Sequence, residues 1–392
     1  MMKKVLLMNV LYKPNVGGIE NSISEISKIL IDNGYEVDIL CSNRNNEDET
    51  RLEAICKKNR AKIYRYDYDY SKFSFLRNIL NSKKAFKDLN DKNKYSFIIS
   101  RNYFLVIVAA ITGVKNIKYI PPEVSYYSKK GTKSRPSLKE LSRDSIKFLL
   151  QWFALILSKD VYVLSESMFN QVRQISLRLI SPEIVNPGIN LERFSIPNLE
   201  EKNKLKDLYG VSKNKKNLLA LGRFSEIKQF DLAILAMTLL PDDYLLILVG
   251  SGPEREKYQN IINKNNLKDR VLLFNSTTSP EDFYKMADVF LMTSRYESFG
   301  QTILEACVSG LQIISFSRKS GVNTNTELML SECEGAYLVE EQSIDALANT
   351  IMESFENKKI AHSNFTKNQN ILSKRYSWNN FVSSLNIPID KF

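Results

Sequence analysis

The stretch KKVLLMNVLYKPNVGGIENSISEISKILIDNGYEVDILCS, residues 3–42, predicts a complete strand–helix–strand unit. Residues 3–10 form an apolar run, which is typical of a strand buried on both faces. Gly17 and Gly18 mark a turn, and the apolar residues that follow at spacings of four, three and four lie on one face of a helix. Residues 35–42 then give a second strand. Because parallel strands need a crossover of this kind, the stretch indicates a parallel α/β sheet.

The same alternation continues along the chain and begins afresh after Asn186, Pro187 and Gly188. It predicts an α/β protein with two doubly wound, Rossmann-like domains and a turn-rich boundary near residues 186–200. A chain of 392 residues is long enough for two such domains, each with its own core. The further strand-like runs are residues 96–101, 117–122 and 160–165 before the boundary, and 217–222, 244–250, 271–275, 289–294, 311–316 and 336–340 after it.

Composition excludes several classes of protein. Apolar residues make up 43% of the chain and charged residues 25%, which is usual for a globular protein and excludes a disordered one. The longest apolar runs, residues 104–114 and 148–157, are shorter than the roughly 18 residues of a membrane span, and the N-terminal run is too short for a secretory signal. The four cysteines include no C-x-x-C pair, and the single histidine, His362, disfavours a triad or a His-rich metal site. We therefore expect a cytoplasmic protein without a bound metal.

The net charge of +11 lies in the first half of the chain. Residues 1–200 contain 32 Lys and Arg against 21 Asp and Glu, whereas residues 201–392 contain 23 of each. This asymmetry suggests an anionic partner for the first half, although no motif for nucleic-acid binding accompanies it. Residues 129–159 hold eight cations and end in the apolar run FLLQWFALIL, residues 148–157. The pattern fits either a core helix or contact with an anionic membrane surface, and these interpretations are compatible.

Charged residues gather where two strands of the second half end. The sequence GRFSEIK, residues 222–228, follows an apolar strand and places Arg223 and Lys228 where they suit a diphosphate. Glu297 follows another strand, and Glu305 lies two helical turns later, so both can face one cleft. Carboxylates accept hydrogen bonds from vicinal hydroxyls, so the four residues together fit a sugar nucleotide.

Two common nucleotide motifs are absent, since neither G-x-G-x-x-G nor G-x-x-x-x-G-K-[ST] occurs in the expected place. Asp67 and Asp69 could suggest a metal–diphosphate site, but they stand in the Tyr-rich stretch RYDYDYSKF and favour a loop. Glycines at strand ends, such as Gly222, Gly250 and Gly300, let backbone N–H groups approach a phosphate.

Six motifs in order along the chain resemble the retaining family-4 glycosyltransferases of the GT-B fold. Glu297 to Glu305 matches the E-x7-E motif of that family, and the resemblance covers nearly the whole chain. The other matching segments are Gly17–Glu20, Asn186–Asn190 with Phe194, Gly222–Lys228, Val249–Glu254 and Tyr376–Trp378.

The resemblance implies two Rossmann-like domains that face each other across a cleft. Residues 1–190 with about 376–392 would form the acceptor-binding domain, and residues 191–375 the nucleotide-sugar-binding domain. Arg223, Lys228 and Glu297 would be catalytic: the two cations would hold the diphosphate, and Glu297 would contact the hexose. The resemblance also implies retention of the anomeric configuration and no need for a metal or other cofactor. The further donor-binding residues that it implies are Gly17, Gly18, Gly250, Phe274, Asn275, Ser298, Phe299, Gly300 and, for the ribose hydroxyls, Glu305.

The sequence also departs from the family. A histidine common at the end of a middle strand is replaced by residues 119–123, where Glu123 is either an acceptor-side contact or an ordinary surface or helix-start glutamate. The glycine usual after Phe274 is replaced by Asn275, and the usual proline and paired glycines near residues 312–322 are missing. These departures leave the donor sugar and its base open.

We therefore predict a retaining hexosyltransferase that uses a nucleotide-diphosphate sugar, with UDP as the expected carrier. Its acceptor would be a glycan or a lipid-linked molecule in the synthesis of cell-surface polysaccharide or glycoconjugate. The protein would be cytoplasmic, with a peripheral position on the inner face of the membrane as a further expectation. The alternatives are a catalytically idle GT-B subunit that binds a partner transferase or a glycan, and a GT-B phosphorylase.

Overall fold

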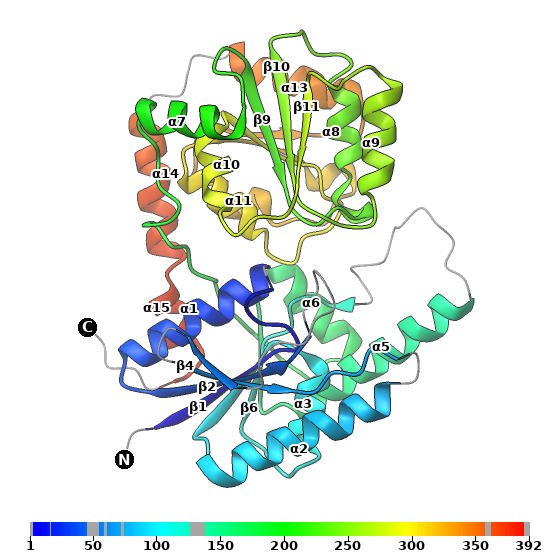
Figure 1. The fold of residues 1–392 in the computed structure, drawn as a ribbon, viewed down its shortest axis with the longest axis vertical. Coiled ribbons are helices and arrows are strands. Elements are labelled where there is room, and N and C mark those ends of the chain that lie inside the picture. The colour runs from blue at the N-terminus through cyan, green and yellow to red at the C-terminus, as the bar shows by residue number, and fades with distance from the viewer. Residues whose placement is uncertain are drawn as a thin grey trace. The chain divides into compact units, whose positions relative to one another are not determined.

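The computed structural model describes residues 3–15, 17–44, 55–58, 61–71, 74–125, 138–356 and 362–387. The chain divides into two compact units, Met1–Pro187 with Trp378–Phe392, and Gly188–Ser377 (Figure 1). We call them the first and the second unit. Each is a doubly wound α/β unit built on a parallel sheet, as the alternation of strands and helices predicts.

The sheet of the first unit has the strand order β3-β4-β2-β1-β5-β6-β7-β8 among the described residues. Among the strand pairs that the described residues form in this sheet, only β3–β4 is antiparallel, and the others are parallel. The chain leaves β1 toward β2 and β4 and later returns to build outward from β5, so the order reverses between β1 and β5. The strands are β1 Lys4–Met8, β2 Glu36–Ser42, β3 Ile55–Lys58, β4 Ala61–Tyr66, β5 Phe97–Ser100, β6 Ile117–Tyr119, β7 Asp160–Val163 and β8 Glu183–Ile184.

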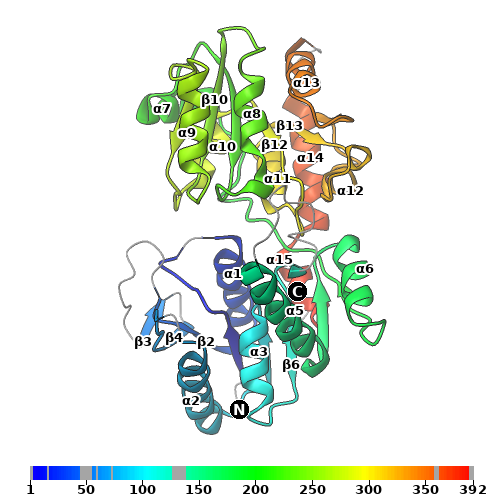
Figure 2. The same cartoon turned by 90° about the vertical axis from the view of Figure 1, so that its right-hand side faces the viewer.

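Helices cover both faces of this sheet, and α1 packs against α15 while α3 packs against α2 and α5. Figure 2 shows α3 between α2 and α5. In α1, Ile23, Ile26 and Leu30 are buried, so the apolar spacing in the sequence corresponds to the helix face that covers the sheet. The helices are α1 Gly18–Asp32, α2 Phe75–Asn93, α3 Tyr103–Ala110, α5 Leu138–Leu157, α6 Glu166–Ile175 and α15 Trp378–Ser384.

The second unit has a parallel sheet with the order β11-β10-β9-β12-β13-β14. The chain runs from β9 outward through β10 to β11, then returns to β12 and continues to β14 on the other side. The order therefore reverses between β9 and β12, and a sheet of this kind binds ligands at the carboxyl ends of the strands beside such a reversal. The strands are β9 Lys216–Leu221, β10 Tyr244–Val249, β11 Val271–Phe274, β12 Val289–Met292, β13 Gln312–Phe316 and β14 Ala336–Val339.

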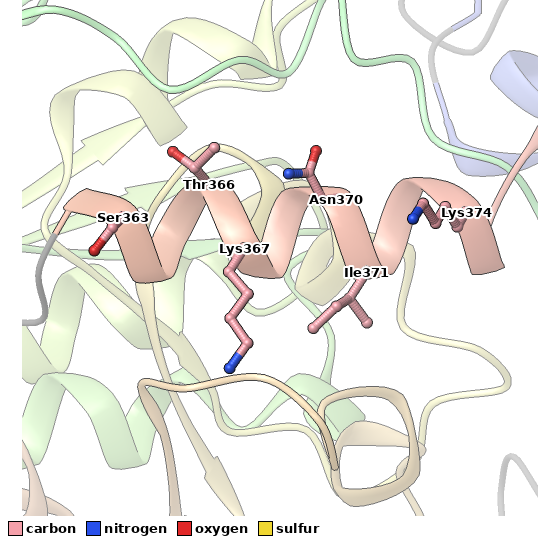
Figure 3. Close-up of a pocket in the computed structure, with 6 residues that line it drawn as sticks. All are labelled: Ser363, Thr366, Lys367, Asn370, Ile371 and Lys374. Atoms are coloured by element: carbon pink, nitrogen blue, oxygen red, sulfur yellow. The ribbon is translucent and has the colours of Figure 1, made fainter.

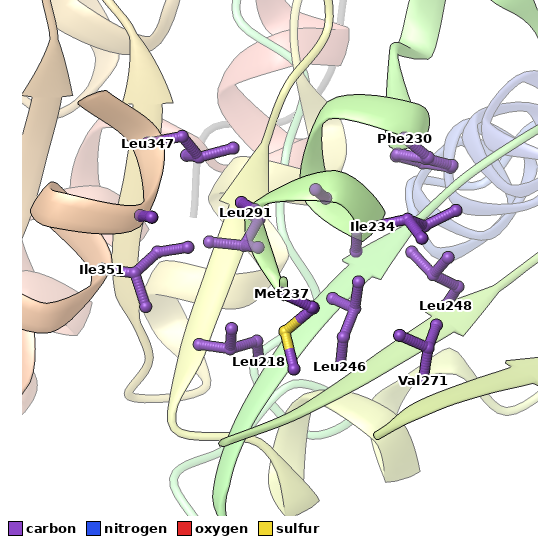
Figure 4. Packing of buried hydrophobic residues seen from close by; sticks show 14 of the residues in the cluster. Leu218, Phe230, Ile234, Met237, Leu246, Leu248, Val271, Leu291, Leu347 and Ile351 are labelled. Carbon is purple, nitrogen blue, oxygen red and sulfur yellow. The ribbon is translucent and has the colours of Figure 1, made fainter. Parts of the chain in front are cut away.

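The core of the second unit lies between its sheet and the helices α8 and α13 (Figure 4). Strand residues such as Leu218 and Leu246 meet Ile234 and Met237 from α8 and Ile351 from α13, and all are buried. This core fixes the strand ends from which the charged residues emerge. The helices are α7 Leu199–Tyr209, α8 Phe230–Ala236, α9 Arg255–Lys264, α10 Pro280–Met286, α11 Gln301–Val308, α12 Thr326–Met329, α13 Ile344–Glu356 and α14 His362–Arg375, with short 3₁₀ helices at Glu226–Lys228 and Arg318–Ser320.

Among the described residues, no helix is long and apolar enough to span a membrane. The apolar run at 148–157 forms the second half of α5, which is buried on one side, at Ala154 and Leu155, and exposed on the other, at Leu149 and Phe153. The core interpretation therefore holds for one side of the run. The other side is apolar surface without a partner in the described structure, and contact with a membrane stays a prediction. The basic residues Lys129, Lys130, Lys133 and Arg135 lie outside the described residues.

Candidate functional site

The reversal of strand order brings the two charged segments of the second unit together. Strands β9 and β12 are neighbours, with Leu218 paired to Val289 and Leu219 to Phe290. The segment after β9 contains Arg223 and Lys228, and the segment after β12 contains Glu297. The two segments therefore leave the sheet side by side at its carboxyl edge, as the sequence predicts.

Two glycines allow the turns after β9 and β10 to touch. A Cβ atom on Gly250 would lie 1.9 Å from the carbonyl oxygen of Gly222, and one on Gly252 would lie 2.3 Å from the carbonyl oxygen of Phe224. The turns are joined by backbone hydrogen bonds from Gly222 N to Val249 O, 3.0 Å, and from Phe224 N to Ser251 O, 2.8 Å. Only glycine fits at both positions without displacing backbone.

Arg223 stands on this turn with its side chain exposed, while its neighbour Phe224 is fully buried. The Phe224 ring packs edge-on against Phe230, at 5.9 Å between centroids, and Tyr258, at 5.4 Å. In the described part of the chain no carboxylate forms an ion pair with Arg223. The core thus fixes the backbone of the turn, and the guanidinium group above it is available to an anion.

Lys228 and Glu297 contact each other directly. The ammonium group of Lys228 donates to Glu297 Oε1, and both side chains are only about one-sixth exposed, 16% and 15%. Ser294 Oγ donates to the same carboxylate oxygen at 2.9 Å, and Glu297 N donates to Asn323 O at 2.9 Å. The family resemblance implies separate roles for Lys228 and Glu297, and the structure shows that in the free protein each is the partner of the other.

Backbone contacts hold this pair in place. Thr293 Oγ1 donates to Lys228 O at 2.7 Å, and Arg295 N donates to Ile227 O at 2.9 Å. These bonds tie the 3₁₀ helix that ends at Lys228 to the segment after β12. A lysine and a glutamate held rigidly at one point favour recognition of a ligand that presents an anion beside hydroxyl groups.

Glu305 lies on α11, in a more apolar position. Tyr284 of α10 donates its hydroxyl to Glu305 Oε2 at 3.0 Å. Burial raises the pKa of the Glu305 carboxyl from an ordinary 4.5 to about 7, while the Tyr284 hydroxyl and the charge of Arg193 oppose this shift. Arg193 is itself held by Glu281, with Nε at 2.8 Å from Oε2. A partly buried carboxylate with one fixed donor keeps acceptor capacity for the hydroxyls of a ligand.

The remaining predicted donor residues of the second unit are distributed along the same edge. Gly250 N donates to Phe274 O at 3.2 Å, so β10 and β11 end beside the Gly222 turn. The Phe274 ring packs against Phe283, at 5.1 Å between centroids, and Asn275 is exposed. Ser298, Phe299 and Gly300 precede α11; of these, Phe299 is buried against Tyr376, at 5.7 Å between ring centroids.

The predicted residues of the first unit have local partners. Gly17 precedes α1, and a Cβ atom there would lie 2.4 Å from Glu20 Oε2. Gly18 is the first residue of that helix. Glu123 forms an ion pair with Lys147 of α5, at 3.0 Å, which favours the interpretation as a structural glutamate over an acceptor contact. No cluster of three or more potential metal ligands occurs among the described residues.

Sequence reasoning missed the residues that support the charges. Ser294, Thr293 and Asn323 hold the Lys228–Glu297 pair, and Tyr284 holds Glu305. None of them has a signal of its own in the sequence, because their contacts depend on which strands and helices are neighbours.

A separate hollow of about 330 Å³ lies on the surface of α14 (Figure 3). It contains none of the predicted site residues and carries no functional argument. Its lining comes from one helix: Ser363, Thr366, Lys367, Asn370, Ile371 and Lys374.

Comparison with known proteins identifies the family. The model described as "Glycosyltransferase Family 4" matches residues 16–193, and the model "Glycosyl transferases group 1" matches residues 201–370. The UDP-Gal:alpha-D-GlcNAc-diphosphoundecaprenol alpha-1,3-galactosyltransferase of Escherichia coli is 26% identical over 267 residues, which are 64% of this chain and 63% of that enzyme. The match thus spans less than two thirds of that relative.

Two solved structures share the fold over almost the whole chain. The sucrose-phosphate synthase of Thermosynechococcus elongatus has a TM-score of 0.82 at 19% identity and covers 98% of this chain and 97% of its own. Anabaena HepE in complex with UDP and glucose has a TM-score of 0.74 at 17% identity, with the same coverage. Because the two family models between them match most of both units, the chain belongs to the family-4 glycosyltransferases, which have the GT-B fold.

Proposed function

We propose that this protein transfers a hexose from a nucleotide-diphosphate sugar, with UDP as the carrier, to a hydroxyl group of a glycan or lipid-linked acceptor. The observation that carries the proposal is the Lys228–Glu297 pair beside the exposed Arg223, at the strand-order reversal of the second unit. The E. coli relative, whose name specifies a UDP-sugar and a lipid-diphosphate acceptor, supports it. The second unit would bind the donor, and the first unit the acceptor.

The chemistry follows from where charge develops. When the bond between the anomeric carbon and the diphosphate breaks, negative charge grows on the departing diphosphate. Arg223 and Lys228 stabilise that charge: Lys228 is already held in place, and Arg223 stands on a turn whose backbone the core fixes. The diphosphate takes over the Lys228 ammonium group from Glu297, and the released carboxylate accepts hydrogen bonds from the hexose hydroxyls. Glu305 accepts hydrogen bonds from the ribose hydroxyls.

We further propose that the reaction retains the anomeric configuration and requires no divalent metal. The E-x7-E pattern of Glu297 and Glu305 supports retention, since the family with this motif is a retaining one. Arg223 and Lys228 supply two positive charges, which is what a divalent ion would contribute at a diphosphate. Anomeric analysis of the product by NMR tests the first point, and turnover in the presence of EDTA tests the second.

The direct test is nucleotide binding followed by turnover. In a thermal-shift assay, UDP and UDP-hexoses should raise the unfolding temperature of the wild-type protein, because a ligand that binds only the folded state stabilises it. Lys228→Ala should abolish the shift. Lys213→Ala is the control, because it removes a lysine of the same unit that forms an exposed ion pair, with Asp207.

Product analysis separates the alternatives. A transferase needs an acceptor hydroxyl, and a phosphorylase would release sugar phosphate when inorganic phosphate is added. An idle subunit would bind the nucleotide sugar without consuming it. Absence of any nucleotide-dependent shift, or an unchanged shift in Lys228→Ala, would contradict the donor site.

We also propose that the first unit meets an anionic membrane surface, which suits a lipid-linked acceptor. The supporting observation is the outer face of α5, where Ile146, Leu149 and Phe153 are 56%, 52% and 48% exposed at spacings of three and four. Ile156 and Leu157 continue the same face. An apolar face on a basic unit favours insertion into the headgroup region of acidic lipid.

Liposome sedimentation tests this part of the proposal. The protein should sediment with anionic but not with zwitterionic vesicles, and should detach at about 0.5 M salt, where charges are screened within a few ångströms. Phe153→Gln should weaken sedimentation. Leu239→Gln is the control, because Leu239 is similarly exposed, at 44%, but lies in the second unit. Equal sedimentation with both kinds of vesicle, or with neither, would remove the membrane surface from the proposal.

A further inference from the structure

Two loops at the carboxyl edge of the first unit's sheet are locked together. Strands β2 and β4 are neighbours and end at a shared pair, Ser42 with Tyr66. Directly after them, Asn43 bridges the loops: its Nδ2 donates to Asp67 Oδ1 at 2.9 Å, and its Oδ1 accepts from Tyr68 N at 2.8 Å. The loop 67–70 is the part of the Tyr-rich stretch RYDYDYSKF that follows β4, and these hydrogen bonds hold it in a defined conformation.

A third loop joins them from the end of β1. Asn15 Nδ2 donates to Arg44 O at 3.0 Å, and Arg65 Nη2 donates to Lys13 O at 2.8 Å. The loops that follow the carboxyl ends of three neighbouring strands, β1, β2 and β4, therefore meet around Arg44. This edge is where doubly wound sheets bind their ligands.

At this junction an arginine lies against two tyrosine rings. The guanidinium carbon of Arg44 is 5.3 Å from the Tyr68 ring centre and 5.9 Å from that of Tyr70. The two rings meet edge to face, at 5.2 Å and 75°. All three side chains remain partly exposed to solvent. The group thus presents a cation and two aromatic surfaces together.

The polar atoms of this group are incompletely used. Arg44 Nη1 lies 3.5 Å from the Tyr68 hydroxyl, but Arg44 Nε and the Tyr70 hydroxyl are shielded from solvent and have no hydrogen-bond partner among the described residues.

The acidic residues beside Arg44 are engaged elsewhere. Asp67 accepts from Asn43, and Asp69 accepts from Ser71 N at 2.8 Å and pairs with Arg77 at 2.9 Å. Within the described ranges of the chain, no carboxylate lies within ion-pair distance of Arg44. Arg44 therefore carries a positive charge that the described structure does not neutralise.

We propose that Arg44, Tyr68 and Tyr70 form a subsite for a negatively charged sugar of the acceptor. The planar guanidinium fork matches a carboxylate or phosphate group, and the tyrosine faces give the sugar ring an apolar surface with a polar edge. The proposal rests on the proposed glycosyl transfer and narrows its acceptor to an anionic saccharide.

Ligand-observed NMR with small glycosides tests the subsite without knowledge of the natural acceptor. Methyl glucuronide should bind the wild-type protein about tenfold more tightly than methyl glucoside, which differs only in the carboxylate. Glucose 6-phosphate is a third probe, and its affinity relative to the glucuronide tells phosphate from carboxylate. Salt should weaken the binding of both charged probes and leave the glucoside unchanged.

Variants separate the cation from the rings. Arg44→Gln should remove the preference for charged sugars, and Arg44→Lys, which keeps the charge but not the fork, should keep part of it. Tyr70→Leu should weaken all probes. Arg77→Gln is the matched control, because Arg77 is a neighbouring arginine whose charge is already paired with Asp69.

The outcomes distinguish this inference from the proposed function. The shift that UDP causes should persist in Arg44→Gln, since the charged donor residues Arg223, Lys228 and Glu305 lie in the other unit. If the wild-type protein shows the UDP shift but binds glucuronide and glucoside equally, or if Arg44→Gln retains the preference, the anionic subsite is wrong and the transferase proposal stands. If UDP causes no shift while the preference is present, the proposed function fails instead, and Arg44 binds anionic sugars for another purpose.

Discussion

Replacing Glu305 by glutamine should make the protein more stable and less able to bind its donor. Burial raises the pKa of the Glu305 carboxyl from 4.5 to about 7. Between these values the folded protein holds a proton that the unfolded chain has released, so stability contributed by this group falls as pH rises from about 4.5 to about 7. Above pH 7 the carboxylate is ionised in both states, and its charge destabilises the fold.

The size of this effect follows from the same two values. At about 1.4 kcal/mol per pKa unit, the difference corresponds to roughly 3 kcal/mol at pH 8. Glutamine has nearly the same shape, can still accept the hydrogen bond from Tyr284, and carries no charge. Glu305→Gln should therefore exceed the wild-type protein in stability by up to about 3 kcal/mol at pH 8 and match it near pH 4.5. The variant should bind UDP more weakly at pH 8, because a neutral amide is a poorer acceptor for ribose hydroxyls than a carboxylate, and this deficit should shrink near pH 4.5, where the wild-type carboxyl is itself neutral.

Urea unfolding of both proteins at about pH 5 and about pH 8 measures the stability difference directly. Glu256→Gln is the control, because Glu256 is an exposed glutamate on α9 of the same unit and its replacement should change little at either pH. A stability difference of equal size at both pH values, or a variant less stable than wild type at pH 8, would refute the reasoning, because it would show that the buried charge is not what separates the two proteins.

Further predictions concern the charged edge and its turns. Arg223→Ala and Lys228→Ala should each lower kcat by ~10²–10³ with the fold retained, as measured by turnover and circular dichroism, since each removes a fixed charge that stabilises the leaving group. Glu297→Gln should reduce kcat more than donor affinity. A loss of acceptor affinity alone would mean that Glu297 contacts the acceptor and not the donor hexose. Gly252→Ala should lower the unfolding temperature more than Gly210→Ala, because its Cβ would lie 2.3 Å from a backbone oxygen whereas the space around Gly210 is open.

The architecture could be predicted because it depends on local patterns. The strand expected at 3–10 is β1, Lys4–Met8, and the strand expected at 35–42 is β2, Glu36–Ser42. Both strands are nearly fully buried. Because helices cover both faces of a parallel sheet, such a strand appears in the sequence as a continuous apolar run. By contrast, the pattern gave no sign of β3 and β4; β4 alternates buried and exposed residues and carries Lys62 and Arg65.

The arrangement of the site could be predicted only in part. Position at a strand's carboxyl end is a local property, and it brought Arg223, Lys228 and Glu297 to the same edge. Contact between two of them is not local, since 69 residues separate Lys228 from Glu297. The raised pKa of Glu305 likewise depends on a helix packing that no motif records. Cys307 and Cys333 show the same limit: they are far apart in sequence, yet Cys333 raises the pKa of the Cys307 thiol.

The two cations of the donor site are stabilised in different ways, and this difference decides how variants at Glu297 should be interpreted. Arg223 is exposed, so water solvates its charge in the absence of a ligand. Lys228 is mostly buried, and its charge depends on Glu297. Removing Glu297 therefore does two things: it deletes the proposed contact to the hexose, and it leaves a buried ammonium group without its partner. A fall in stability or in turnover after Glu297→Gln mixes these effects.

Only a double-mutant cycle with Lys228 separates them, because in the Lys228→Ala background the change at Glu297 no longer exposes an unpaired charge. If the loss of stability disappears in that background while the loss of turnover remains, Glu297 acts on the substrate directly and not merely by supporting its lysine.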